Sequence, residues 1–281
     1  MKLKFTKMHG IGNDYIYFSA FDQTINDPNA LSVKLSDRRF GIGGDGIILV
    51  CPSDIADAKM RIFNEDGSEA KMCGNGIRCV AKFVYDHGIV PPEKTTVAID
   101  TLSGVKTIDL TVENGKAVSA KVDMGAAILK PADIPMNHPG DTVINQPLLV
   151  DGELYMVTAV SMGNPHCVTF VDEVDSLALE KIGPRFENHP AFPDRVNTEY
   201  VKVIDDRTLQ MRVWERGSGE TWACGTGACA TVVAACLNGF CKKGEDITVH
   251  LRGGDLIIRY TDETIMMTGP ATTVFEGEVE V

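Results

Sequence analysis

The chain has 281 residues, 44% of them hydrophobic, enough for one large domain or for two domains of about 140 residues each. Its formal net charge of −12, with Lys and Arg scattered along the chain, would repel a phosphate backbone and excludes nucleic acid as an expected partner. No stretch approaches the roughly 18 apolar residues that span a bilayer, and the first residues lack the apolar core of a signal peptide. We therefore predict a cytoplasmic protein with no membrane role.

Eight cysteines are too sparse in a chain of this length to indicate a disulfide scaffold, so most are expected to be reduced. No Cys-x-x-Cys pair is present, and the pairs Cys73/Cys79 and Cys224/Cys229 have the wrong spacing for structural zinc. We predict no metal. The ordinary interpretation of any one cysteine is a small buried hydrophobic residue.

The first half shows an alternation of strand and helix patterns. Asp27 is a good N-cap, and Pro28 suits the first position of a helix. Four prolines between residues 125 and 151 mark that segment as the expected connection between two halves. The other predicted elements of the first half are strands near residues 3–9, 46–51, 58–64, 95–99, 105–112 and 118–122, and a short helix after Cys73.

Residues Gly41–Gly46 formally match the glycine fingerprint of dinucleotide-binding proteins. That motif needs a strand before it and a helix after it. Here a helical stretch precedes the glycines and the apolar strand 47–50 follows them. We therefore interpret the segment as a plain turn and predict no nicotinamide or flavin cofactor.

An internal repeat organises the chain. Residues 60–64 resemble 211–215, and Cys73-Gly74-Asn75-Gly76 resembles Cys224-Gly225-Thr226-Gly227. The offset is the same in both cases, since 211 − 60 and 224 − 73 are both 151. Gly12-Asn13 and Gly163-Asn164 keep that register without a gap, which indicates two homologous halves.

The two helices that follow the repeated cysteines are the most informative elements. Asn75 and Thr226 are interpreted as their N-caps, and Gly88 and Gly239 as their C-terminal stops. The second helix, residues 227–238, contains no charged side chain and must be buried on every side. We predict an α+β fold built twice, each half with its strands around a central helix.

Cys73 and Cys224 each precede a helix N-terminus, where free N–H groups and the helix dipole favour an anion. Such a position lowers the pKa of a thiol and makes its thiolate accessible near neutral pH. The alternative is a pair of packing cysteines inherited with the repeat. The first amides of the two helices, at Gly74, Asn75, Gly225 and Thr226, are also suited to hold a substrate carboxylate.

If the halves face each other, the two thiols approach one carbon from opposite sides. Enzymes that invert an amino-acid α-carbon without a cofactor need one base and one acid in that arrangement. The repeat therefore predicts an acid/base pair rather than two unrelated cysteines.

Five motifs resemble the diaminopimelate epimerase family. They lie at Met8–Asp14, Asn64–Glu69, Met72–Cys79, Met162–His166 and Glu215–Gly227, and the resemblance spans essentially the whole chain. It implies a cofactor-independent epimerase that interconverts LL- and meso-diaminopimelate in lysine and peptidoglycan precursor biosynthesis. It makes Cys224 the proton acceptor and Cys73 the donor in the forward direction.

The same resemblance assigns the other site residues. Arg216 offers a planar fork for the distal carboxylate of the substrate, and Glu215 offers an acceptor for its ammonium group. An arbitrary pair of this kind would be a solvated surface pair, and a lone His166 would be a structural histidine. The substrate-binding positions implied are Asn13, Asn64, Gly74, Asn75, Asn164, Asn197, Glu215, Arg216, Gly225 and Thr226, with His166 and Glu215 in support of activity.

The resemblance also implies two pseudo-symmetric domains, each a mixed sheet curled around a central helix. Their expected boundaries are residues 1–124 with 270–281, carrying Cys73, and residues 125–269, carrying Cys224. A homodimer is implied as well. Two positions depart from the family: Gly46 stands where some members have glutamine, and Phe275 stands where members tend to have a tyrosine at the dimer contact.

Two other functions are compatible with parts of the pattern. A proline racemase-like protein also uses paired cysteines in a duplicated fold, but the residues around each thiol favour the dicarboxylic substrate. A non-catalytic thiol or metal-binding protein would be recognised by its metal content and by the accessibility of its cysteines.

Overall fold

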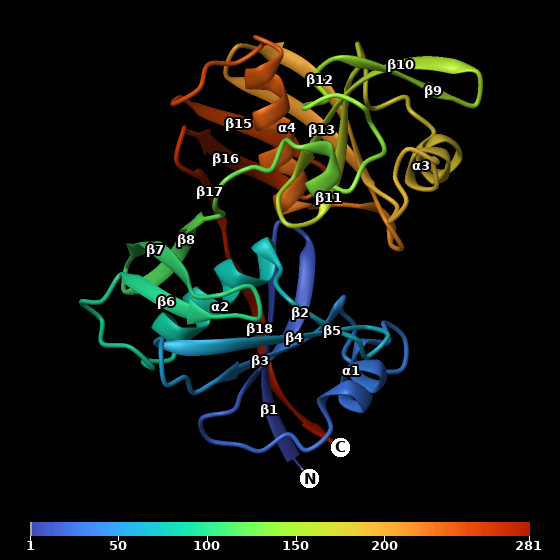
Figure 1. The fold of residues 1–281 in the computed structure, drawn as a ribbon. Helices are drawn as coiled ribbons and strands as arrows, with labels where there is room; N and C mark the ends of the chain where they lie inside the picture. Colours follow the sequence, from blue (N-terminus) through green and yellow to red (C-terminus); the bar gives the residue numbers. More distant parts are fainter. Residues whose placement is uncertain (1) are drawn as a thin grey trace. The chain divides into compact units, whose positions relative to one another are not determined.

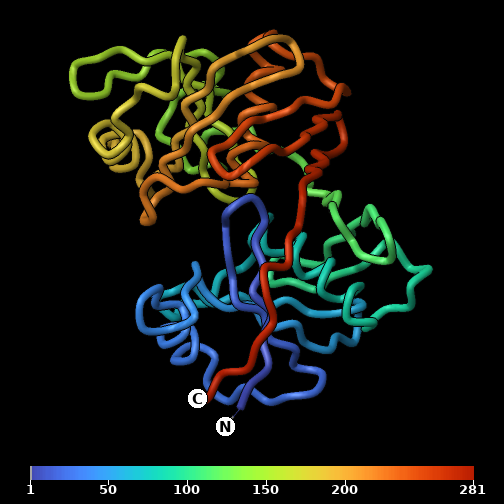
Figure 2. The backbone as a smooth tube through the Cα atoms, turned by 180° about the vertical axis from the view of Figure 1, so that it is seen from behind, coloured from blue at the N-terminus to red at the C-terminus, as the bar shows by residue number. Residues whose placement is uncertain are grey.

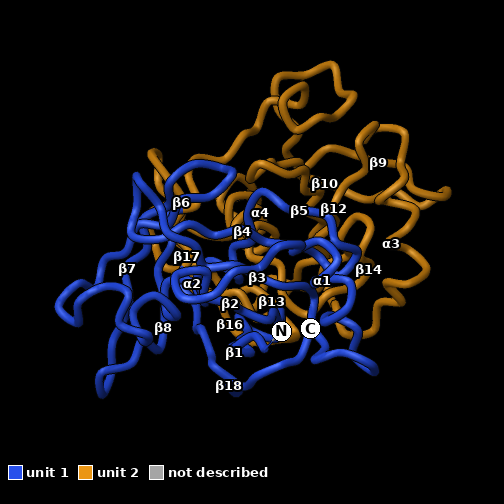
Figure 3. Tube along the Cα trace, turned by 90° about the horizontal axis from the view of Figure 1, so that it is seen from below, with its two compact units in different colours: residues 1–123, 268–281 blue, residues 124–267 orange. Residues whose placement is uncertain are grey.

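A computed structural model describes residues 2–281, which form two compact units (Figure 3). Unit 1 comprises the residues up to 123 together with 268–281, and unit 2 comprises residues 124–267. Each unit combines a mixed β-sheet with two α-helices, the α+β arrangement predicted from the sequence (Figure 1). The chain therefore leaves unit 1 once, builds unit 2, and returns to unit 1 with its last strand.

Unit 1 contains most of the elements predicted for the first half. The strands expected at 46–51 and 58–64 are present with those bounds. The Asp27 side chain accepts a hydrogen bond from the Ala30 amide at 3.0 Å and begins α1, as predicted. The elements are β1 (Lys2–Gly10), β2 (Asn13–Ser19), α1 (Pro28–Ser36), β3 (Gly46–Cys51), β4 (Ala58–Asn64), β5 (Glu69–Ala70), α2 (Gly74–Asp86), β6 (Thr96–Asp100), β7 (Lys106–Glu113), β8 (Lys116–Asp123) and β18 (Thr272–Glu280).

Unit 2 repeats this outline. Its elements are η1 (Pro131–Asp133), β9 (Gln146–Val150), β10 (Glu153–Ser161), β11 (Pro165–Phe170), α3 (Leu179–Glu187), β12 (Asn197–Asp205), β13 (Thr208–Glu215), β14 (Gly219–Thr221), α4 (Gly225–Leu237), β15 (Asp246–Leu251) and β16 (Gly254–Tyr260). The strand β17 (Ile265–Pro270) carries the chain from unit 2 back to unit 1.

The structure confirms the internal duplication with the same offset of 151 residues. The helices α1 and α2 have nine and 13 residues, and α3 and α4 begin and end 151 positions later. The parallel pair Ile16 and Ile47 of β2–β3 recurs as Cys167 and Thr198 of β11–β12. Register is preserved because the same residues must face the core in both units.

One ion pair also recurs in the duplication. Arg61 lies 2.8 Å from Glu69 in unit 1, and Arg212 lies 2.8 Å from Glu220 in unit 2. Each pair ties a strand to the hairpin that leads to the cysteine loop.

The central helices are enclosed by the strands of their own units. The helix α2 contacts β1–β4 and β6–β8, and α4 contacts β10–β13, β15 and β16. Ten of the 13 residues of α4 are buried, as its lack of charge predicted. The helix α2 differs, because it buries two charged side chains. The Arg78 guanidinium bonds the carbonyl of Pro270 at 3.2 Å, and the Lys82 ammonium bonds Asp86 at 2.7 Å.

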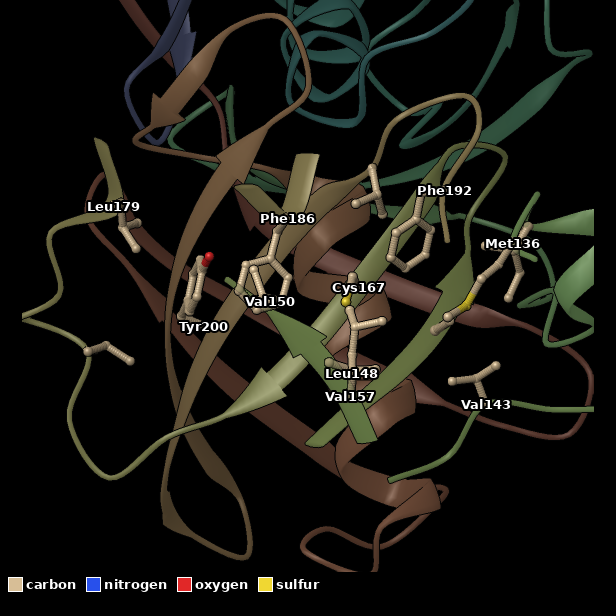
Figure 4. Close-up of a cluster of buried hydrophobic side chains, with 14 residues drawn as sticks. Met136, Val143, Leu148, Val150, Val157, Cys167, Leu179, Phe186, Phe192 and Tyr200 are labelled. Carbon is tan, nitrogen blue, oxygen red and sulfur yellow. The ribbon is translucent and has the colours of Figure 1, made fainter. Parts of the chain in front are cut away.

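The proline-rich segment 125–151 is not the connection that the sequence suggested. Its apolar side chains Ile134, Met136 and Val143 are buried in the core of unit 2, and residues 146–150 form β9. Figure 4 shows Met136 and Val143 beside Leu148, Phe186 and the other side chains of this core. The prolines lie at positions that suit their fixed backbone within this packed segment. Pro131 begins η1, and Pro147 lies in β9, which pairs with β10.

The last strand of the chain completes the sheet of unit 1. The strand β18 pairs antiparallel with β1, from Lys2 opposite Glu280 to His9 opposite Thr272 (Figure 2). Phe275 on this strand is 47% exposed and packs edge-on against the Phe5 ring.

The glycine-rich segment before β3 is a turn, as predicted. The helix α1 precedes it and a strand follows it, which is the reverse of the dinucleotide fingerprint. A Cβ atom at Gly46 would lie 2.1 Å from the Phe63 carbonyl oxygen, so this backbone leaves no room for a side chain.

Candidate active site

The two repeated cysteines are themselves the N-caps of the central helices. The Cys73 sulfur accepts the Gly76 amide at 3.3 Å, and the Cys224 sulfur accepts the Gly227 amide at 3.4 Å. The prediction that Asn75 and Thr226 are the caps is wrong, because both lie inside the first helical turn. The cap position holds each sulfur against the positive end of a helix.

Hydrogen bonds of unit 1 lead from Cys73 to the β1–β2 turn and the loop before β3. The thiol donates to Asn13 Oδ1 at 3.3 Å, and the Asn13 amide donates to Asp45 at 2.6 Å. Arg38 then donates to Asp45 at 2.7 Å. The asparagine therefore presents its oxygen to the sulfur because a carboxylate holds its amide nitrogen.

Ion pairs hold the β1–β2 turn, which carries Asn13, in place. Arg38 and Lys7 both pair with Asp14, at 2.7 and 2.5 Å. Burial by itself would raise the pKa of Asp14, but these hydrogen bonds bring it below its usual value. The carboxylate stays ionised and holds the segment that carries Asn13.

The other predicted residues of unit 1 lie around the same cap. Asn75 Oδ1 accepts from Arg78 at 3.0 Å, and the Gly74 carbonyl accepts from the same guanidinium at 3.1 Å. Asn64, at the end of β4, donates to the Ser68 hydroxyl at 3.1 Å. The buried Arg78 thus orients the first turn of α2, a role that the sequence did not reveal.

Unit 2 surrounds Cys224 with a longer polar chain. The Cys224 sulfur lies 3.6 Å from the Thr226 hydroxyl, to which the Asn164 amide donates at 3.3 Å. Asn164 Oδ1 lies 3.1 Å from His166 Nε2, and His166 Nδ1 lies 2.6 Å from Glu199 Oε1. Both His166 and Glu199 are fully buried.

The Glu215 carboxylate and the Arg216 guanidinium are the remaining charged groups predicted for the site in unit 2. Glu215, at the end of β13, accepts a hydrogen bond from the Thr221 hydroxyl. The Arg216 amide donates to Asn197 Oδ1 at 3.0 Å, and its guanidinium donates to the Asp194 carbonyl at 2.9 Å. The Arg216 side chain therefore has no carboxylate partner among the contacts of the described chain, unlike Arg212 with Glu220.

The electrostatics of Cys224 differ from the expectation. Burial raises the pKa of this thiol well above its usual value, and the carboxylates of Glu215 and Glu199 raise it further. The helix N-terminus lowers a thiol pKa as expected, but desolvation and two like charges outweigh it here. Burial also raises the pKa of Glu215, which brings a carboxylate and a thiol of perturbed acidity side by side.

The predicted site residues are divided into two clusters by unit. The cluster of unit 1 consists of Asn13, Cys73, Gly74 and Asn75 at the α2 cap, together with Asn64 at the end of β4; that of unit 2 consists of Asn164, His166, Asn197, Glu215, Arg216, Cys224, Gly225 and Thr226. Asp45 and Glu199 were missed. Glu199 had a signal in the sequence, because it is an acidic residue within an otherwise uncharged stretch of a strand, Asn197–Val201.

Within residues 2–281, every helix falls short of the length and apolar character that a membrane span requires. No group of three His, Cys, Asp or Glu side chains is placed to hold a metal ion in the same part of the chain.

Comparison with known proteins identifies close relatives. A family model described as diaminopimelate epimerase matches residues 5–130 and 158–274. A diaminopimelate epimerase of Acetivibrio thermocellus is 55% identical over 281 residues, covering 99% of each chain. One from Methanococcus maripaludis is 56% identical over 281 residues, covering 99% of this chain and all of that one.

Solved structures of lower identity share the fold. A hydroxyproline epimerase of Agrobacterium vitis has a TM-score of 0.73 at 14% identity, covering 99% of this chain and 91% of that one. A phenazine biosynthesis protein of the PhzF family from Bacillus anthracis has a TM-score of 0.72 at 17% identity, with all of both chains covered. Likeness to the racemase-like proteins therefore extends to the fold alone.

Proposed function

We infer that this chain, which belongs to the diaminopimelate epimerase family, inverts the α-carbon of its substrate with Cys73 and Cys224 as acid and base. It is an enzyme that interconverts LL- and meso-diaminopimelate, in lysine and peptidoglycan precursor biosynthesis. One observation carries the assignment of the two thiols. Their sulfurs cap the N-termini of the two central helices, and they occupy equivalent positions of two duplicated units.

The chemistry follows from these positions. In the forward direction the Cys224 thiolate takes the α-proton from one face of the carbon, and the Cys73 thiol gives a proton to the other face. Cys224 ends as a thiol and Cys73 as a thiolate, so the reverse reaction uses the same groups in exchanged roles. The α-carboxylate of the substrate is held by the first amides of the helices, at Gly74, Asn75, Gly225 and Thr226.

Glu215 acts as the base that deprotonates Cys224. A thiol whose pKa is raised by burial needs a nearby acceptor of its proton, and burial has raised the pKa of this carboxylate toward that of the thiol. The proton moves from Cys224 to Glu215, which leaves a thiolate beside a neutral carboxylic acid. The two like charges are then never present together.

The rest of the substrate is held by the amide and guanidinium side chains. Arg216 pairs with the distal carboxylate as a planar fork, and exchanges its bond to the Asp194 carbonyl for a charged partner. The distal ammonium group meets oxygen acceptors. These acceptors come from the asparagines of the two clusters, Asn13, Asn64, Asn164 and Asn197, together with Glu215.

Replacing Arg216 by lysine tests this arrangement. Lysine keeps the charge but cannot present two parallel N–H groups, so kcat/KM is expected to fall about 10-fold or more, in line with the loss of one charged bidentate contact. The fold should be unchanged, because the guanidinium contacts only one carbonyl. Steady-state kinetics with LL-diaminopimelate measure the effect.

Arg259→Lys is the matched control, because Arg259 forms an exposed ion pair with Asp246 in the same unit. It should leave kcat/KM within twofold of the wild type, since an exposed ion pair contributes about 0–1 kcal/mol. Unchanged kinetics in Arg216→Lys would instead make Arg216 a surface residue with no role in substrate recognition.

Assembly and location complete the proposal. The enzyme works as a homodimer, with Val274 and Phe275 of β18, which are 54% and 47% exposed, as a candidate contact. It works in the cytoplasm, where a reducing environment keeps its eight cysteines as thiols. It needs no cofactor, and incorporation of solvent deuterium at Cα of the meso product formed from LL-diaminopimelate, with no cofactor added, tests the proposed reaction.

A further inference from the structure

Glu199 is a buried carboxylate that the proposed reaction does not use. It lies within β12 with its side chain fully buried. Its Oε1 atom lies 2.6 Å from His166 Nδ1, and its Oε2 atom is buried without a hydrogen-bond partner in the described chain. A carboxylate in such a place is costly unless it is paired with a positive charge.

The duplicated unit shows what the fold requires at this position. The counterpart of Glu199, 151 residues earlier, is Ile48, which is fully buried in β3. Both side chains lie under the first turn of the central helix. A Cβ atom added to Gly76 would lie 2.8 Å from Ile48 Cδ1, and one added to Gly227 would lie 2.7 Å from Glu199 Oε1. The fold is therefore satisfied by an apolar side chain here, and the carboxylate in unit 2 needs another explanation.

The hydrogen bonds that begin at Glu199 have a direction. Glu199 accepts from His166 Nδ1, and His166 Nε2 faces Asn164 Oδ1, which is also an acceptor. Two acceptors around one imidazole require both of its nitrogens to carry protons. Asn164 then donates its amide to the Thr226 oxygen, and the Thr226 hydroxyl proton is left to point at the Cys224 sulfur.

The two thiols therefore meet opposite groups. An acceptor, Asn13 Oδ1, faces Cys73 and suits a thiol that carries a proton. A hydroxyl donor faces Cys224 and suits a thiolate. The Glu199 carboxylate alone raises the pKa of Cys224, but an imidazolium at His166 offsets that charge. The pair then acts on Cys224 through the direction of these donors.

We propose that Glu199 is a positioning residue that keeps His166 doubly protonated and thereby turns the Thr226 hydroxyl toward the Cys224 thiolate. This inference rests on the proposed function, since it assigns the groups that prepare one of the two proposed thiols. With a neutral His166 the Asn164 amide would turn over to donate to Nε2. Thr226 would then donate to Asn164 instead of to the sulfur, and the thiolate would lose its side-chain donor.

Glu199→Gln tests the inference, because glutamine keeps the size and the acceptor but removes the charge that holds the imidazolium. We expect kcat to fall about 10- to 100-fold. This is the range found in metal sites when a hydrogen-bond partner that orients a ligating residue is removed. KM should change little, since Glu199 is buried away from any ligand. The kcat/KM values of both directions should fall by one factor, because the equilibrium between the isomers is unchanged. Glu173→Gln, which removes an exposed carboxylate paired with Lys202, is the matched control and should keep wild-type kinetics.

Nitrogen-15 NMR of labelled histidine gives a readout that does not depend on activity. Wild-type His166 should show the signals of an imidazole that carries protons on both ring nitrogens. In Glu199→Gln the His166 signal should become that of a neutral ring. A neutral His166 in the wild type, or wild-type kcat in Glu199→Gln, would overturn the inference.

A second variant covers the case in which Glu199→Gln fails to fold. Glu199→Ile combined with His166→Tyr installs the Tyr15 and Ile48 side chains of unit 1 at the equivalent positions. It should unfold at or above the wild-type temperature and lose kcat to the same extent; full activity in this variant would also overturn the inference. Failure of the proposed function gives a different result. In that case the wild-type protein does not exchange the α-proton of diaminopimelate, even though NMR shows His166 doubly protonated.

Discussion

Cys73→Ala and Cys224→Ala are each expected to abolish epimerisation, with a loss at least as large as the roughly 10²–10⁴-fold typical of a general acid or base. Neither thiol alone suffices, because one must remove a proton and the other must deliver one. Both variants should fold, since a thiol sulfur is a weak acceptor of the amide that it caps in each helix. Steady-state kinetics in both directions measure the loss. Cys236→Ala, near the end of α4, is the control and should remain active.

The remaining thiol of each variant should retain half of the chemistry. It still removes an α-proton from the isomer that it faces, so a substrate analogue with a β leaving group should undergo elimination instead of inversion. Cys73→Ala and Cys224→Ala should then prefer opposite configurations at the α-carbon. Near wild-type epimerisation in either variant, or elimination from the same isomer in both, would leave a single base serving both faces.

Mild oxidation is expected to inactivate the enzyme completely and reversibly. If the two thiols act on opposite faces of one carbon, as proposed, they can form a disulfide when no substrate separates them, with the oxidant taking up the two hydrogens. Mass spectrometry of the oxidised protein should find a Cys73–Cys224 crosslink.

Dithiothreitol should restore activity as the crosslink disappears, and diaminopimelate present during oxidation should protect the enzyme. The control is Cys73→Ala, which should form no such crosslink. Oxidised, inactive protein that lacks the Cys73–Cys224 peptide would contradict a facing pair of thiols.

The repeat in the sequence predicted most of the fold, because periodic patterns and caps are local properties. The strands 46–51 and 58–64 and the Asp27 cap depend on residues close together in the chain. The duplication could also be recognised from the sequence, because one offset relates Cys73 to Cys224 and the flanking motifs without a gap. The segment 125–151 was misjudged because prolines report local backbone geometry, whereas the burial of Ile134 and Met136 is set by tertiary packing.

The residues that sequence reasoning missed are those whose partners lie far away in the chain. Arg78 bonds a carbonyl 192 residues away, and Glu199 bonds a histidine 33 residues away on another strand. The raised pKa of Cys224 belongs to the same group of effects, because the helix N-terminus is local but the burial and the two carboxylates are not. Residue type alone predicts Asn75 and Thr226 as caps, although a cysteine two residues earlier occupies that position in both helices.

Solvent deuterium tests the two-thiol account most directly. LL-diaminopimelate is incubated in D₂O with enzyme and no added cofactor, and the first few per cent of product is analysed by mass spectrometry. If Cys224 removes the proton and Cys73 delivers another, the meso product carries one deuterium at its inverted Cα from the first turnovers, while unreacted LL isomer stays unlabelled. A meso product that keeps the original hydrogen would show one group returning the same proton, and would contradict the acid/base pair.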